Sequence, residues 1–358
     1  MKHGFWTTVK QRADAEKRPI FAMAPMANVT DAAFRRMFAG VREAERAKAV
    51  TANGLSGGTF IGMSVCGPDV FWTEFVSVEG LLSAGREQLL IDLWHTPAER
   101  PIVAQIFGGK PEQFEEVAKL IRELGFDGID INMGCPDSGV EKSGGGAALI
   151  KNPEFAREII RATKRGAGAL PVSVKTRLGY RSTDEMTAWL TALLEEDIAA
   201  LTVHLRTRNE MSAVPAHWEL ARDLIALRDR IAPLTCVLGN GDIASLEEGR
   251  QRAAESGFDG VMIGRGIFGN PWVFTEAGRA PDLRTRLMGM VEHTELYEKL
   301  YRSKPVGERQ LKNFDVMKKH FKAYCSDFDG AKELRIKLME TENAAQVRAL
   351  VEECLKNN

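Results

Sequence analysis

The chain has 358 residues, a formal net charge of −1, and an ordinary globular composition of 44% hydrophobic and 27% charged residues. This near-neutral balance argues against a protein that binds nucleic acid over its whole surface. Apolar runs of about 18 residues are missing, and residues 1–18 are polar and charged, so we expect neither a membrane span nor a secretory signal. Five scattered cysteines show no disulfide or zinc spacing. We therefore expect a cytoplasmic monomer without a metal.

Over the first 275 residues, short apolar runs alternate with amphipathic helical stretches. The expected strands are 20–24, 70–76, 102–107, 128–132, 172–176, 200–204, 234–239 and 260–263. Helical patterns between them include 111–124, 153–165, 183–195 and 218–228, with caps expected at Asn152 and Ser245. Eight strand–helix units in about 260 residues favour an α/β fold of the (β/α)₈ TIM-barrel type. A doubly wound sheet would need a Gly-x-Gly-x-x-Gly turn after the first strand.

Two regions depart from this alternation. Residues 41–68 are Glu/Ala/Lys-rich and then Gly/Ser-rich, which indicates an irregular insertion. From about Asp282 the chain reads as helices only, with helical periodicity over 310–324 and 331–339. We therefore predict a barrel domain at 1–280 that carries the insertion, followed by a small all-helical domain at 281–358.

The predicted helical domain carries most of a basic segment. Between Lys299 and Lys337 there are eleven Lys or Arg against five acidic residues, a net charge of +6. Local charge of this size can hold a polyanion on a protein that is neutral overall. A solvated helix face explains the same composition, and charge alone favours that explanation.

A lone cysteine follows the fourth expected strand. Residues 130–136 read Asp-Ile-Asn-Met-Gly-Cys-Pro, and Ser-Gly-Gly-Gly follows at 143–146. Loops at the carboxyl ends of barrel strands carry the chemistry of such enzymes. An isolated cysteine is more often a small buried apolar residue. Here the Asn-x-Gly-Cys-Pro context and the glycine-rich loop favour a functional thiol at Cys135.

Other strand ends carry residues suited to a flat ring cofactor. The apolar turn at 24–27, Ala-Pro-Met-Ala, can pack under a ring, and Gln105 can donate and accept hydrogen bonds. Lys175 lies on the fifth strand, where an ammonium needs a partner. The electron-rich edge of a reduced flavin is one such partner, and a barrel carboxylate is the other. His204 ends the sixth strand and fits a ligand contact and a core histidine equally well.

The seventh and eighth strands end in glycine-rich loops. These read Gly-Asn-Gly-Asp at 239–242 and Gly-Arg-Gly at 264–266. Loops at these two places form the usual phosphate site of TIM barrels, because glycine lets backbone N–H groups approach the anion. Arg265 adds a planar cation. Turn chemistry explains one such loop, but two on consecutive strands, together with Lys175, indicate a phosphorylated ring cofactor.

With these residues assembled, the chain resembles the tRNA-dihydrouridine synthase family over nearly its whole length, apart from roughly 41–68. The most specific match is Asn-Met-Gly-Cys-Pro at 132–136 with Gly-Gly-Gly-Ala at 144–147. The other matches are Ala-Pro-Met at 24–26, Thr-Asp at 30–31, Phe-Arg at 34–35, Gln-Ile-Phe-Gly at 105–108, Val-Lys-Thr-Arg-Leu-Gly at 174–179, Asn-Gly-Asp-Ile at 240–243 and Gly-Arg at 264–265. Met-Lys-Lys-His-Phe at 317–321 and Lys-Glu-Leu-Arg at 332–335 are similar to the family's helical RNA-binding domain.

The resemblance implies an enzyme that reduces a specific uridine of tRNA to 5,6-dihydrouridine, using FMN with NADPH as reductant. Cys135 would protonate carbon 5 as the general acid while hydride adds to carbon 6. The residues implied to hold FMN are Pro25, Met26, Ala27, Gln105, Lys175, His204, Asn240, Gly241, Asp242, Gly264 and Arg265. The residues expected to bind tRNA are Asn132, Arg177, Lys318, Lys319, Lys322 and Arg335.

The sequence differs from the family pattern at two places, and two alternative functions are also compatible with it. Ser138-Gly139 stand before Val140, where the family usually has a basic residue, and Leu205 replaces the glycine of a His-Gly-Arg-Thr run. An FMN-dependent barrel oxidoreductase acting on a small enone or pyrimidine, such as a dihydroorotate dehydrogenase, would share the phosphate loops without needing the basic tail. A flavin-free RNA-binding or chaperone protein on a barrel scaffold is the other alternative.

Overall fold

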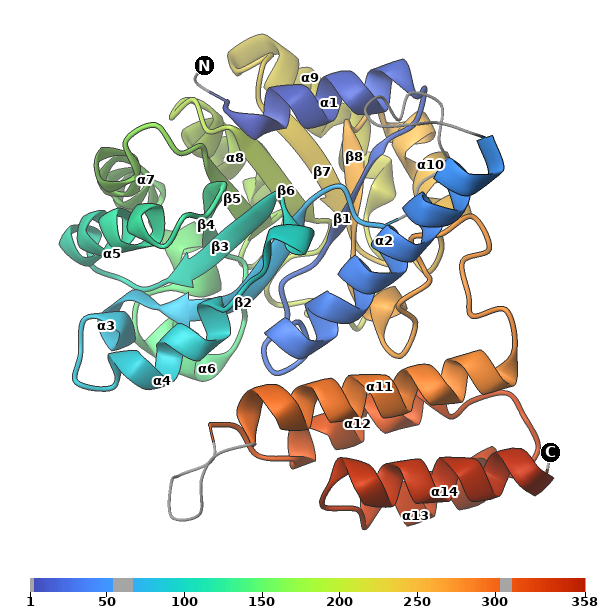
Figure 1. Ribbon diagram of the computed structural model, residues 1–358. Helices are drawn as coiled ribbons and strands as arrows, with labels where there is room; N and C mark the ends of the chain where they lie inside the picture. The colour runs from blue at the N-terminus through green and yellow to red at the C-terminus, as the bar shows by residue number, and fades with distance from the viewer. Residues whose placement is uncertain (1–2, 54–66, 303–310, 358) are drawn as a thin grey trace.

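The computed structural model describes residues 3–53, 67–302 and 311–357, and of 45–53 the backbone only. Eight parallel strands form one curled sheet in the order β1-β8-β7-β6-β5-β4-β3-β2 (Figure 1). The strands are β1 Ile20–Met23, β2 Phe71–Ser77, β3 Ile102–Phe107, β4 Gly128–Met133, β5 Val172–Arg177, β6 Ala200–His204, β7 Cys236–Asn240 and β8 Gly260–Ile263. An isolated parallel bridge between Ala22 and Val70 brings the two outer strands together. The predicted α/β fold is confirmed, and the sheet is consistent with a TIM barrel.

The expected strands agree with the observed ones to within two residues at each end. Strands β1, β3, β4, β7 and β8 are buried at nearly every position. Parallel strands are covered on both faces, so they appear in a sequence as continuous apolar runs. This is why the runs alone locate the strands.

Helices cover the outer face of the sheet. The longer ones are α5 Pro111–Glu123, α7 Pro153–Ala167, α8 Met186–Leu194, α9 Ala221–Ile231 and α10 Leu246–Ser256. The caps expected at Asn152 and Ser245 are confirmed, since each side chain accepts a backbone N–H of the first turn. The short elements are α3 Val78–Leu81, α4 Arg86–Leu90, α6 Ser138–Lys142, and the 3₁₀ turns η1 Ile91–Leu93, η2 Pro97–Glu99, η3 Gly146–Lys151, η4 Thr183–Glu185, η5 Trp218–Leu220 and η6 Arg265–Ile267.

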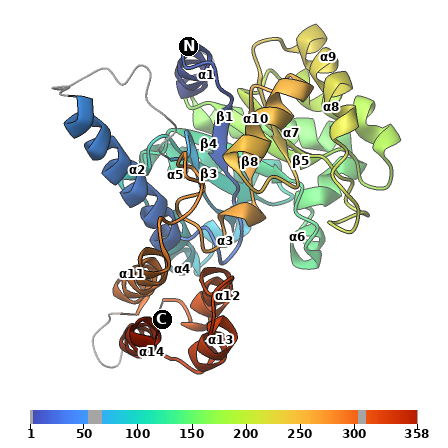
Figure 2. The same ribbon diagram turned by 90° about the vertical axis from the view of Figure 1, so that its right-hand side faces the viewer.

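A helix that the sequence analysis did not predict, α1 (Phe5–Ala15), crosses one end of the barrel (Figure 2). Its buried face consists of Trp6, Val9 and Ala13. These side chains pack in one cluster with residues from the amino-terminal halves of the strands, including Ile20 and Val103. The helix therefore closes the amino end of the barrel and leaves the carboxyl end for a site.

Helix α2 spans Ala32–Asn53. Residues 41–53, which were expected to begin an irregular insertion, are therefore helical, and that part of the prediction is wrong. The alanine, glutamate and lysine content of this stretch is typical of a helix. Of the remainder, residues 54–66 lie outside the described residues.

Among the described residues, four α-helices follow the last strand: α11 Leu283–Tyr301, α12 Asp315–Tyr324, α13 Ala331–Met339 and α14 Ala344–Asn357. They share an apolar cluster that includes Met290, Phe321 and Val347. In both views they lie beyond the end of the barrel opposite α1, the end where α6 follows β4 (Figures 1 and 2). The helix expected over 310–324 begins at Asp315, and residue 310 lies outside the described residues. The C-terminal helices therefore lie at the carboxyl end of the strands.

Candidate active site

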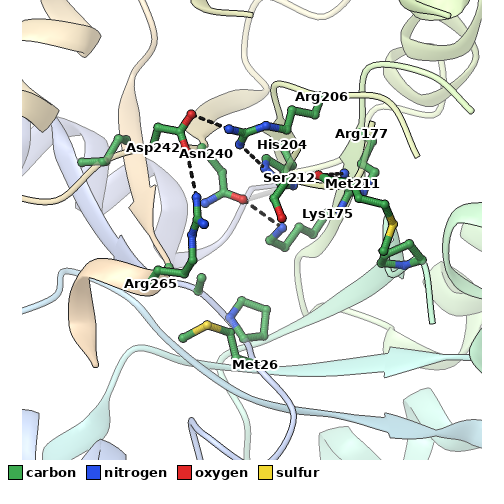
Figure 3. A pocket seen from close by; sticks show the side chains of 16 residues that line it. Met26, Lys175, Arg177, His204, Arg206, Met211, Ser212, Asn240, Asp242 and Arg265 are labelled. Atoms are coloured by element: carbon green, nitrogen blue, oxygen red, sulfur yellow. Dashed lines mark hydrogen bonds and ion pairs between the residues drawn. The ribbon is translucent and has the colours of Figure 1, made fainter. Parts of the chain in front are cut away.

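A cavity of about 310 Å³ opens at the carboxyl ends of the strands (Figure 3). It is bounded by the ends of β1, β5, β6, β7 and β8 and by the loops that follow them. The residues that line it are Ala24, Pro25, Met26, Pro136, Lys175, Arg177, His204, Arg206, Met211, Ser212, Asn240, Gly241, Asp242, Ile243, Gly264 and Arg265. Ten of the predicted site residues are among them. Those that are not are Ala27, Gln105, Asn132, Cys135, Lys318, Lys319, Lys322 and Arg335.

Lys175 points into the cavity from β5, and its Nζ donates to Asn240 Oδ1 at 3.2 Å (Figure 3). Asn240 is itself fixed, because its Nδ2 donates to the carbonyl of Met262 at 2.8 Å. Burial, followed by the charge of Arg177, lowers the pKa of Lys175 to about 8. Within the described ranges no carboxylate forms an ion pair with this ammonium. The barrel-carboxylate alternative is thus not observed, and the ammonium faces the cavity.

His204 ends β6 in a chain of hydrogen bonds that crosses the cavity wall (Figure 3). Arg206 donates to His204 Nε2 at 3.1 Å, to the carbonyl of Val214 at 2.6 Å and to the Asp242 carboxylate. Arginine cannot accept a hydrogen bond, so Nε2 of His204 must be unprotonated. Burial and then the neighbouring cations lower the pKa of His204 well below its ordinary value. The ring is therefore neutral and carries its proton on Nδ1.

The loops after β7 and β8 meet at Asp242 and Arg265. Asp242 Oδ1 accepts from Arg265 at 2.9 Å, and Oδ2 accepts the N–H of Ala216 at 2.9 Å. Burial alone acts to raise the pKa of Asp242, but these hydrogen bonds and nearby cations lower it below its ordinary value. Gly241 has φ of 129°, and a Cβ there would lie 2.8 Å from Ala216 Cβ. At Gly264 the nearest atom to such a Cβ, Ala24 Cβ, is 3.8 Å away, which is ordinary van der Waals contact, so the structure has room for a side-chain carbon there.

Asn132, on β4, fixes the backbone of the loop that carries Cys135. Its Oδ1 accepts the N–H groups of Gly134 at 3.1 Å and Cys135 at 2.9 Å. From the glycine-rich loop, Ala147 N–H donates to the Cys135 carbonyl at 2.9 Å. Cys135 does not line the cavity, but the next residue, Pro136, does. The structure therefore places Cys135 next to a residue that lines the cavity, on a loop whose backbone is fixed by three hydrogen bonds.

Gln105 supports this loop rather than lining the cavity. Asn132 Nδ2 donates to Gln105 Oε1 at 3.1 Å, and Gln105 Nε2 donates to Asp130 at 2.6 Å. Asp130 also accepts from the hydroxyl of Ser173 at 2.5 Å. Burial raises the pKa of Asp130 to about 6. This buried acid lies within the Asp-Ile-Asn-Met-Gly-Cys-Pro run, and the sequence analysis did not assign it a role.

Arg177 joins the two loops that flank the thiol. Its guanidinium donates to the carbonyl of Gly134 at 2.8 Å and to the carbonyl of Met211 at 3.0 Å. Burial raises the pKa of Cys135, although the charges of Lys175 and Arg177 act in the opposite direction. The thiol is therefore protonated at neutral pH, with two cations near it.

The cations predicted to bind tRNA lie on the C-terminal helices. Lys319 and Lys322 are exposed on α12, and Lys318 pairs with Asp315 one turn away at 2.7 Å. Arg335 on α13 donates to a backbone carbonyl at 2.8 Å. These side chains are separate from the cavity, and their role in binding tRNA stays a prediction.

One cation counted in the basic segment is not on the surface. Lys312 Nζ lies 2.5 Å from Glu74 Oε2 and 2.7 Å from Asp92 Oδ1, and its side chain is only 10% exposed. A lysine paired in this way is neutralised inside the protein. The net charge of +6 therefore overstates what the segment presents to a polyanion.

Sequence reasoning missed several residues of the cavity wall. Arg206 lies in the run His-Leu-Arg-Thr at 204–207, and its position two residues after a strand-end histidine is a signal that the sequence contains. Met211 and Ser212 belong to a loop of ordinary composition, where no signal exists. Ala24 belongs to the turn that was expected to pack under a ring, and the lining residues without a predicted role are Pro136, Arg206, Met211, Ser212 and Ile243.

Two negative findings concern the described residues. Within residues 3–53, 67–302 and 311–357, we find no group of three or more His, Cys, Asp or Glu side chains arranged to hold a metal ion. Over the same part of the chain, the helices lack the length and apolar character needed to cross a membrane.

The sequence model described as dihydrouridine synthase (Dus) matches residues 22–358. "Probable tRNA-dihydrouridine synthase" from Staphylococcus aureus (strain MRSA252) is 42% identical over 354 residues, which cover 99% of this chain and 96% of that protein. "Probable tRNA-dihydrouridine synthase 2" from Bacillus subtilis (strain 168) is 40% identical and covers 99% and 97%. The chain belongs to the dihydrouridine synthase family. The resemblance noted in the sequence is therefore confirmed.

Among solved structures, the chain is similar to morphinone reductase in complex with tetrahydroNAD, with a TM-score of 0.46 and 15% identity over 74% of this chain and 89% of that one. It is also similar to a variant of NCR from Zymomonas mobilis, with a TM-score of 0.47 and 15% identity over 80% and 92%. At this level the likeness concerns the general fold and not the site.

Proposed function

We propose that the protein is an FMN-dependent tRNA-dihydrouridine synthase, which reduces a uridine of tRNA to 5,6-dihydrouridine with NADPH. The observation that carries the proposal is that the backbone of Cys135 is fixed next to Pro136, which lines a cavity with a buried lysine and two glycine-rich loops. Relatives that match the chain over nearly its whole length carry the name tRNA-dihydrouridine synthase. The small-molecule alternative needs no C-terminal helices, and these relatives include them.

The residues present fit a phosphorylated flavin. Lys175 offers a cation that the described carboxylates leave without an ion pair, and the neutral His204 offers an Nδ1–H donor. Met26 lies across the cavity from Lys175, as an apolar wall for a ring (Figure 3). Gly264 and Arg265 line the cavity where the phosphate would lie, and the side chain of Arg265 is 70% exposed. Bound FMN supplies hydride to the substrate after reduction by NADPH.

The described side chains then divide the remaining work. Cys135 donates its proton to carbon 5 of the uracil, which quenches the negative charge that hydride addition leaves on the ring. Lys175 and Arg177 lie close enough to stabilise the thiolate that results. Asn132 keeps the thiol in place through the two N–H groups that it accepts. A stacked base must leave its helix to reach this cavity.

The C-terminal helices form a separate tRNA-binding domain in this proposal. Lys318, Lys319, Lys322 and Arg335 contact backbone phosphates, which position the tRNA without reading its sequence. Reversing the charge of Lys319 and Lys322 then weakens tRNA binding and reduces the slope of its salt dependence. Unchanged binding would place the tRNA on another surface.

Ala27 and Gln105 remain predicted cofactor contacts, although neither lines the cavity.

The decisive experiment compares the wild type with Cys135→Ala. We expect both proteins to be purified with FMN and to reduce it with NADPH, and only the wild type to form dihydrouridine in unmodified tRNA. Full product formation by Cys135→Ala would remove the thiol from the mechanism. A colourless protein that cannot be loaded with FMN would instead favour the flavin-free RNA-binding alternative.

A further inference from the structure

The C-terminal helices contact the barrel at a buried charge cluster away from the cavity. Lys312, just before α12, places Nζ between Glu74 of β2 and Asp92 of η1, at 2.5 and 2.7 Å. The side chain of Glu74 is 5% exposed. Burial raises the pKa of Glu74 to about 7, although Lys312 acts to lower it. Lys312 is therefore the cation that allows this carboxylate to be charged inside the protein.

The second oxygen of Glu74 holds the turn after β1. Glu74 Oε1 accepts the N–H of Asn28, a residue in the left-handed region with φ of 53°. A non-glycine residue in this conformation needs support from its surroundings. Glu74 supplies that support from one side and binds Lys312 on the other.

The same turn forms one wall of the cavity. Met26, two residues before Asn28, lines the cavity. Its N–H donates to Thr30 Oγ1 at 2.9 Å, and its carbonyl accepts the N–H of Thr30 at 3.1 Å. The two hydrogen bonds between Met26 and Thr30 therefore define a turn, and Asn28 lies at its middle.

A second contact from the C-terminal helices reaches the end of the turn. The hydroxyl of Tyr301, the last residue of α11, accepts the N–H of Ala32 at 3.0 Å. This N–H belongs to the first turn of α2, where backbone donors lack partners within the helix. Figure 1 shows α11 beside the start of α2. The C-terminal helices thus hold this segment at both Asn28, through Glu74, and Ala32.

We propose that Lys312 is a positioning residue that fixes the Met26 wall of the cofactor cavity through Glu74 and Asn28. The C-terminal helices are then energetically coupled to cofactor binding, in addition to their part in binding tRNA. Such coupling is reciprocal, so the bound cofactor stabilises the contact between the helices and the barrel. The identity of the cofactor rests on the proposed function.

The test follows FMN release from the full-length holoenzyme after dilution, by flavin fluorescence. We expect Lys312→Met to bind FMN on the order of tenfold more weakly, because Glu74 then lacks the ion pair that holds its carboxyl group in position against the Asn28 N–H. Lys337→Met is the matched control. It breaks an exposed ion pair to Glu353 on the same helices and leaves FMN affinity unchanged.

Two double variants separate positioning from a general loss of stability, because both lack the Lys312–Glu74 ion pair and both leave Asp92 without its lysine partner. Glu74→Gln with Lys312→Met keeps an oxygen for the Asn28 N–H, and we expect it to restore FMN affinity to nearly that of the wild type. Glu74→Leu with Lys312→Met has no acceptor, and we expect weak binding. This comparison stands even if Lys312→Met alone does not fold.

Equal FMN affinity in the two double variants would overturn the coupling, as would wild-type affinity in a folded Lys312→Met protein. In both cases the proposed function survives, because the wild type still holds FMN. A wild-type protein that binds no FMN would remove the proposed function and the coupling together.

Discussion

Replacing Asn132 by alanine tests whether this residue of β4 fixes the loop that carries Cys135. The substitution removes two hydrogen bonds to the N–H groups of Gly134 and Cys135 and one to Gln105. At about 1 kcal/mol for each bond, the free energy of unfolding falls by about 3 kcal/mol. We expect FMN to remain bound, the thiol to react faster with a disulfide reagent, and dihydrouridine formation to slow on the order of tenfold or more.

Urea unfolding, thiol labelling and single-turnover product formation measure these three effects. Asn152→Ala is the matched control, because it removes the cap bond of α7 at a residue that does not line the cavity and has no side-chain bond to the Cys135 loop among the described residues. It should lower the free energy of unfolding by about 1 kcal/mol and leave thiol reactivity alone. If Asn132→Ala has the same free energy of unfolding and the same thiol reactivity as Asn152→Ala, other contacts hold the loop and the reasoning fails.

Three further predictions concern the cavity and the strands beneath it. Lys175→Met should weaken FMN binding by about 1.5–3 kcal/mol through loss of a charged donor, and normal flavin content after gel filtration would contradict this. Gly241→Ala should destabilise the protein by about 1–3 kcal/mol, because φ is 129° and the added carbon meets Ala216, whereas Gly264→Ala should unfold like the wild type. Asp130 has its pKa raised to about 6 in the folded protein, so the folded state binds more protons than the unfolded state between about pH 4 and 6, and stability falls as pH rises through that range. Urea titrations of Asp130→Asn across this range should show a smaller decrease, and an identical decrease would assign the effect to another group.

The strands were predictable because their signal is local. Strand β3 is apolar at five of its six positions, and a short run of that kind between turn residues is typical of a buried parallel strand. Helix α1 gave no comparable signal, because its buried residues are only Trp6, Val9 and Ala13 and most of the residues between them are polar or charged. The boundary of α2 failed for a related reason. A change of composition at residue 41 was interpreted as a change of structure, although alanine, glutamate and lysine continue a helix well.

The sequence predicted the parts of the candidate site where a residue type at the end of a strand has few structural explanations. Lys175 and the glycines of the phosphate loops are of this kind. Lys312 shows the limit, because its charge made it one cation among eleven, and only the fold shows that Glu74 and Asp92 surround it. The role of Arg206 could not be predicted from the sequence for the same reason. Its partners are His204 at the end of β6 and Asp242 in the loop after β7, and only the fold brings them together.

The cavity brings together titratable groups whose surroundings assign them different tasks. Arg206 donates to His204 Nε2, and burial lowers the pKa of His204 well below its ordinary value, so the ring is neutral and a poor proton source at neutral pH. Lys175 has a pKa of about 8, and donating its proton would remove the positive charge that faces the cavity. Burial raises the pKa of Cys135, so the thiol keeps its proton at neutral pH, and the nearby cations favour the thiolate once the proton has left. Because a good acid must be protonated beforehand and stabilised afterwards, the geometry favours Cys135 over both neighbours as the general acid.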